Sequence, residues 1–178
     1  TPNVIGDIRA ALAFIVKGAI GEGAMQRRNA ELTQRCINAW RDVDQLELLG
    51  SLTATRLPIF SFRIKDGKGG YVHQKLATRL LSDCYGIQAR GGCACAGPYV
   101  HRLLSINAEE SEQMQQEILA GNEIRKPGFV RLNLSVLLPD DKVEFILDSV
   151  LQLSQVAEQF EAFYDVDARR AIFFPHAT

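Results

Sequence analysis

A glycine- and cysteine-rich segment over residues 89–99 does most to limit how this chain can fold. Its order is Ala89-Arg90-Gly91-Gly92-Cys93-Ala94-Cys95-Ala96-Gly97-Pro98-Tyr99. An apolar run precedes it and a helical pattern over residues 99–104 follows it. Closely spaced glycines interrupt both patterns, so we expect a short strand over 87–89, a bent loop and a helix start. Such a junction brings a thiol, a guanidinium and free backbone N–H groups together, which suits chemistry on an anionic ligand.

Hydrophobic periodicity predicts the other elements. Helical spacing predicts a first helix that begins after a cap at Asn3 and ends at Gly21. It predicts further helices over about 24–40, 73–85 and 107–121, and from 139 onward. Apolar and β-branched runs predict strands over 46–49, 59–64 and 129–134. The tail, from Asp165 to Thr178, contains an apolar run that we expect to dock on a neighbouring surface. This order predicts a single α+β domain over 1–178, with a small, mostly antiparallel sheet covered by helices.

Composition narrows the class of protein. The formal net charge of −1 predicts no large basic surface for nucleic acid. The apolar runs are too short to span a bilayer, so we expect no membrane segment, and we find no signal-peptide pattern. The four cysteines are unevenly spaced and favour free thiols in a reducing, cytoplasmic compartment.

Cys95 is the first candidate for chemistry. It precedes the predicted helix, and Arg90 lies five positions before it, so positive charge and helix N–H groups can lower the pKa of its thiol. The alternative is a small apolar residue packed in a turn. Cys93 either assists as a second thiol or fills space, whereas Cys84 and Cys36 lie on apolar helix faces and are expected to pack in the core.

A zinc site is a rival use of these thiols. Cys84, Cys93, Cys95 and His101 can be assembled as ligands, but the sequence lacks a Cys-x-x-Cys pair, so we predict no metal. His101 is otherwise expected to be a surface residue.

Arg131 is the second candidate, on the predicted strand after Pro127-Gly128. Strand alternation places Val130 and Leu132 on one face and Arg131 on the other. A strand arginine beside a glycine-rich loop can grip a carboxylate through two parallel hydrogen bonds. The alternative is an ordinary exposed arginine.

The two segments together resemble a known family. Residues 86–96, followed by Gly128-Phe129-Val130-Arg131-Leu132-Asn133-Leu134, resemble the C-terminal domain of class V aminotransferases, which are pyridoxal-phosphate enzymes of fold type I. The cysteine desulfurase and selenocysteine lyase branch is the closest in pattern. Thr1-Pro2-Asn3 resembles the point where that family's large domain passes to the small one.

The resemblance implies roles by position. Cys95 corresponds to the nucleophile that takes sulfur from cysteine and leaves alanine. Arg131 corresponds to the arginine that binds the amino-acid carboxylate, and Arg90 to the arginine of the cysteine loop. The implied partners are an amino-acid substrate, a sulfur acceptor protein and a second copy in a homodimer of the full-length enzyme.

The resemblance also implies parts that this chain does not supply. In the family, the large domain carries the Schiff-base lysine, the ring-stacking histidine and the aspartate that pairs with the pyridinium. We therefore expect the 178-residue chain to bind pyridoxal phosphate poorly and to be inactive alone. Two alternatives stay open: a class V aminotransferase or lyase in which Cys95 is not catalytic, and a non-enzymatic binding domain.

Overall fold

The structure, a computed structural model, describes residues 2–92 and 97–176. Its elements follow the chain in this order: α1 (Val4–Ile20), α2 (Glu22–Trp40), β1 (Leu46–Leu48), β2 (Ile59–Ile64), α3 (Gln74–Tyr85), β3 (Arg90–Gly92), α4 (Gly97–Leu103), α5 (Ala108–Leu119), the 3₁₀ helix η1 (Glu123–Arg125), β4 (Phe129–Asn133), α6 (Asp140–Glu161), β5 (Tyr164–Asp167) and β6 (Ile172–Pro175). The fold is α+β, as the sequence predicts.

One antiparallel sheet forms the centre of the fold. Its four strands lie in the order β1-β2-β4-β3, and each neighbouring pair is antiparallel. The strands that alternate most clearly, β2 and β4, lie in the middle of this order. Their inward residues are apolar, because a strand that packs on one face only needs apolar side chains at every second position.

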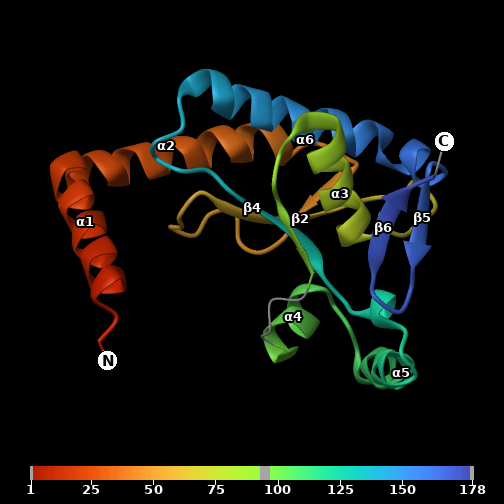
Figure 1. The fold of residues 1–178 in the computed structure, drawn as a ribbon. Coiled ribbons are helices and arrows are strands. Elements are labelled where there is room, and N and C mark those ends of the chain that lie inside the picture. Colours follow the sequence, from red (N-terminus) through yellow and green to blue (C-terminus); the bar gives the residue numbers. More distant parts are fainter. Residues whose placement is uncertain (1, 93–96, 177–178) are drawn as a thin grey trace.

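Three helices, α2, α3 and α6, cover the apolar face of the sheet (Figure 1). Trp40 at the end of α2 packs edge-on against Phe60 of β2, with ring centroids 5.5 Å apart. Its indole Nε1 also donates a hydrogen bond to the carbonyl oxygen of Leu147 in α6, at 3.2 Å. One side chain therefore joins both helices to the sheet, and α4 and α5 lie on the other side (Figure 1).

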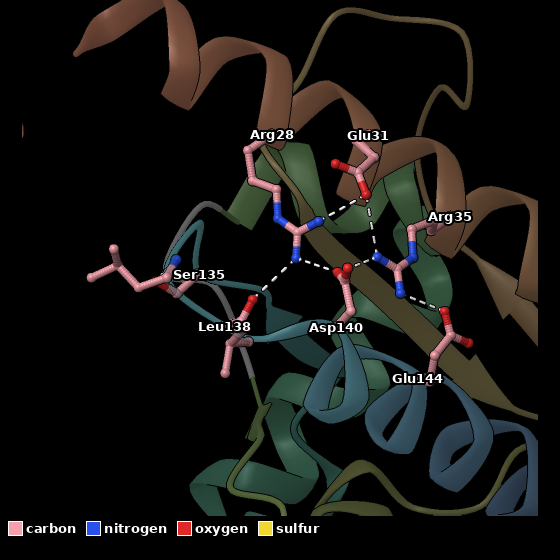
Figure 2. A network of polar contacts seen from close by, with 8 residues as sticks. Arg28, Glu31, Arg35, Ser135, Leu138, Asp140 and Glu144 are labelled. Carbon is pink, nitrogen blue, oxygen red and sulfur yellow. Dashed lines mark hydrogen bonds and ion pairs between the residues drawn. The ribbon is translucent and has the colours of Figure 1, made fainter. Parts of the chain in front are cut away.

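A charged network fastens α2 to the start of α6. Figure 2 shows Arg28 and Arg35 of α2 converging on Asp140, each with a guanidinium nitrogen 2.7 Å from the same carboxylate oxygen. Glu31 accepts from both arginines, and Glu144 accepts from Arg35. These hydrogen bonds hold the pKa of the Asp140 carboxyl below its usual value.

Helix α1 projects away from the body of the fold (Figure 1). It has the predicted cap, since the Asn3 side chain accepts a hydrogen bond from the Gly6 N–H. None of its residues is buried, although apolar side chains such as Ile5, Phe14 and Ile15 are among them. No helix of the described residues is long and apolar enough to cross a membrane.

The structure corrects two sequence-based expectations about elements. The strand predicted over 87–89 begins instead at Arg90 and ends at Gly92, because only there does the chain pair with β4. The second concerns the tail, where β5 and β6 form an antiparallel hairpin that the sequence did not predict. Phe173 of this hairpin is buried and lies 5.2 Å from the ring of His73, so the predicted docking surface is the start of α3.

Candidate functional site

Two of the three predicted site residues face one another on adjacent strands. Arg90 of β3 is the register partner of Arg131 of β4. Ser61 of β2 is the partner of Arg131 on its other side, so the three residues form one row across the sheet. Directly opposite residues of an antiparallel pair project to the same face, with Cβ atoms about 4.5–5.5 Å apart. The fold therefore places the Cβ atoms of Arg90 and Arg131 close together on one face of the sheet.

This row lies on the sheet face opposite the helical core. Phe60, Phe62, Val130 and Leu132 occupy the alternate positions and are buried in the main apolar cluster. Arg131 is half-buried at the centre of β4, as its alternation predicted. Part of the same face is covered, because Phe129 packs with residues around α4.

The described residues provide no hydrogen bond or ion pair to the side chains of Arg90 and Arg131. Arg63 on the same face differs, since its guanidinium donates to Glu47 at 2.7 Å and lies over the ring of Tyr71. Like charges directly opposite on neighbouring strands repel each other. An anion between the two guanidinium groups would remove that repulsion, and a carboxylate has the geometry to accept from both.

The nearby glycines are required by close packing. A Cβ on Gly91 would lie 2.7 Å from the carbonyl oxygen of Gln74 in α3. A Cβ on Gly128 would lie 2.7 Å from the backbone carbon of Gly92. The sequence analysis placed Gly91 and Gly92 in a bent loop with free N–H groups, whereas the structure places them in β3. Their absent side chains let α3, β3 and β4 approach, which sets the position of the arginine pair.

The cysteines divide into three cases. Cys93 and Cys95 lie outside the described residues. Cys36 is buried, as expected, and burial raises the pKa of its thiol to about 12. Cys84 was predicted to pack in the core, but it is exposed. The buried residues of α3 are 76, 77, 80 and 81, whereas Cys84 lies in the last turn of the helix, which ends at Tyr85.

Metal ligands do not gather in the part of the chain that is described. Residues 2–92 and 97–176 contain no group of three or more His, Cys, Asp or Glu side chains that could hold a metal ion. His101, one of the four candidate ligands, lies on α4 and is half-exposed.

His73 caps the start of α3. Its Nδ1 accepts the Lys75 backbone N–H at 3.2 Å and its Nε2 lies 3.0 Å from the Ile124 carbonyl oxygen. The two contacts fit the neutral ring with the proton on Nε2. Burial lowers the pKa of His73 below its ordinary value, which favours this neutral form.

The cavity between β2 and α5 does not fit pyridoxal phosphate. That group needs a lysine amine for a Schiff base, a free carboxylate for the pyridinium nitrogen and a ring to stack on. A cavity of about 340 Å³ between β2 and α5 contains Lys126 and Glu110. Lys126 forms an ion pair with Glu123, and Glu110 is engaged in the capping box of α5. The lysine and the carboxylate are therefore both already paired.

A family model described as aminotransferase class-V matches residues 1–132, which include both arginines of the candidate site. No curated protein matches the chain.

Proposed function

Because the chain belongs to the class V aminotransferase family, we propose that it forms the amino-acid-binding side of an enzyme of the cysteine desulfurase type. The family generally uses pyridoxal phosphate. The observation that carries the proposal is the pairing of Arg90 with Arg131 on adjacent strands. An amino-acid substrate presents a carboxylate, which is the ligand that two adjacent guanidinium groups hold best.

Arg131 is the residue that we assign to the substrate carboxylate, with Arg90 beside it. Arg131 lies on a central strand and is half-buried, so it loses less hydration on binding than a freely exposed side chain. A carboxylate fixed at this point orients the rest of the substrate, which is how positioning contributes to rate.

Cys95 is proposed as the sulfur acceptor. It follows Gly92 by three positions in the sequence. Its thiolate would attack the sulfur of bound cysteine, the substrate C–S bond would break, and alanine would leave. The sulfur atom then remains on the protein as a persulfide, and the atoms balance without an added oxidant or reductant. The electron sink that labilises this bond is pyridoxal phosphate, and since the cavity between β2 and α5 does not fit it, we propose that a lysine-bearing domain supplies its site.

The test measures alanine release from cysteine in the enzyme that combines this chain with the lysine-bearing domain. We expect Arg131→Gln to raise KM for cysteine by about 10- to 100-fold, because a charged hydrogen bond contributes about 1.5–3 kcal/mol. Cys95→Ser should abolish alanine release. Arg102→Gln, an exposed arginine on α4, is the matched control and should leave both quantities unchanged.

The two variants decide different parts of the proposal. An unchanged KM in Arg131→Gln would remove the carboxylate assignment. Full turnover in Cys95→Ser would leave the enzyme in the family but exclude the desulfurase reaction, which favours an aminotransferase or lyase reaction instead.

A further inference from the structure

A second concave site lies at the outer edge of β3. It has a volume of about 440 Å³. Four segments far apart in the sequence form its walls: the start of α3 (Gln74, Lys75), β3 (Arg90, Gly91, Gly92), the region of η1 (Glu123, Lys126) and the turn between β5 and β6 (Arg170, Ala171). We call this the edge pocket.

The edge pocket concentrates positive charge. Lys75, Arg90, Lys126 and Arg170 line it, and the one acidic residue, Glu123, forms an ion pair with Lys126. Three cations remain, and among residues 2–92 and 97–176 their side chains have no ion pair or hydrogen bond. The whole chain has a net charge of −1, so this excess is local and does not follow from composition.

Several cations elsewhere in the fold have an acidic partner. Arg35 is joined to Asp140, Arg63 to Glu47, Lys68 to Glu158 and Arg79 to Asp83. Several like charges around one cavity raise the free energy of the folded state unless a counter-charge enters. Three cations that have no partner among the described residues line this one pocket, which favours a ligand that supplies negative charge.

The walls also leave room for such a ligand. Gly91 and Gly92 present backbone without side chains, and a Cβ on Gly92 would face the Lys75 ammonium nitrogen at 3.9 Å. Because β3 is the last strand of the sheet order, its outer edge keeps backbone groups that no other strand pairs. Lysine ammonium groups and arginine guanidinium groups, beside a strand edge that has no side chains, can donate hydrogen bonds to phosphate oxygens.

We propose that the edge pocket binds a small anion that carries a phosphate or diphosphate group. A charge of about −2 or −3 balances three unpaired cations, whereas a single carboxylate leaves most of the repulsion in place. This site goes beyond the proposed function. Its test changes Lys75 and Arg170, which have no assigned part in binding the amino acid.

The test is a titration of the 178-residue chain with pyrophosphate, followed by amide chemical shifts and by calorimetry, at about 10 mM ionic strength. We expect shifts centred on residues 75, 91, 92, 170 and 171. Lys75→Gln combined with Arg170→Gln should weaken binding by at least about tenfold. Both side chains are exposed, so the variant is expected to fold, which its unfolding midpoint checks.

A matched variant distinguishes a specific anion-binding site from general attraction of the anion to positive charge. Lys142→Gln combined with Arg9→Gln removes the same charge at two exposed positions outside the pocket, and should leave the affinity within about twofold. An equal loss of affinity in this control would overturn the proposal. Shifts of the same size with acetate, or no shifts with pyrophosphate, would overturn it as well.

Discussion

At the scale of single residues, the candidate site depends on its glycines, which have no side chain, as much as on its arginines. Gly91 lies between α3 and β4, and a methyl group there would meet the backbone oxygen of Gln74. That oxygen belongs to the first turn of α3 and cannot move alone. The close approach of α3 to β3 therefore sets the register that places Arg90 opposite Arg131.

Gly91→Ala tests this directly. We expect a loss of about 1–3 kcal/mol in the free energy of unfolding, because the added methyl forces backbone shifts in a packed region. Urea unfolding gives the value. Gly18→Ala is the control, since a Cβ at Gly18 meets nothing within 4 Å and alanine favours a helix. Equal stability for the two variants would show that α3 can retreat from β3 without cost.

His73 predicts a pH dependence of stability. Burial lowers the pKa of His73 in the folded chain. As the pH falls through about 6.5, the His73 ring is therefore protonated in the unfolded chain before it is protonated in the folded chain. The contribution of His73 to the free energy of unfolding is therefore complete above about pH 6.5 and declines below it, by at most about 1.4 kcal/mol per pH unit. Protonation also puts hydrogen on Nδ1, which then can no longer accept the Lys75 N–H.

Urea unfolding at about pH 7.5 and about pH 5.5 measures this effect. His73→Asn keeps an N-cap acceptor and removes the titration, so it should show a smaller change between the two pH values than the parent chain. His101→Asn should retain the parent's change. If all three proteins respond alike, His73 does not carry the dependence.

At the scale of elements, charge fixes the packing of the two longest helices. Asp140 lies in the first turn of α6, where the helix dipole favours a carboxylate, and it also receives both α2 arginines (Figure 2). Arg28 further donates to the Leu138 carbonyl oxygen just before α6. The network therefore sets where α6 begins relative to α2, while Trp40 secures the other end of the contact.

Arg35→Gln should lower the unfolding midpoint, because it removes contacts to Asp140 and Glu144 together. The difference from the parent chain should shrink in about 1 M NaCl, which screens exposed charges. Thermal unfolding in low and high salt measures both. Arg41→Gln, whose ion-pair partner is the adjacent Asp42, serves as the control with little expected change. A salt-independent loss in Arg35→Gln would assign its role to packing.

At the scale of the whole molecule, α1 is the part that the fold leaves uncovered. A helix that is apolar on all sides is normally enclosed by other structure. Ile8 is 52% exposed and Ile15 is 66% exposed, and no residue of α1 is buried. The core below β2 and β4 is complete without it, since the main apolar cluster begins at Leu32.

Ile8→Ser combined with Ile15→Ser should therefore reduce binding of a hydrophobic dye and self-association, and change the free energy of unfolding by less than about 0.5 kcal/mol. Leu76→Ala, at a position that is 0% exposed, should cost about 2–5 kcal/mol in the same assay. A comparable loss in the α1 variant would mean that α1 contributes to the folded core.

The sequence alone determined the order of the helices and strands from α1 to α6, the cap at Asn3, and the face of β4 that carries Arg131. These follow from local periodicity and capping, which neighbouring residues encode. Tertiary structure decided which residues meet. The pairing of Arg90 with Arg131, the outward position of Cys84 and the convergence on the edge pocket depend on contacts between distant segments. Nothing within one segment specifies its register against another, because that register is set by packing across the sheet.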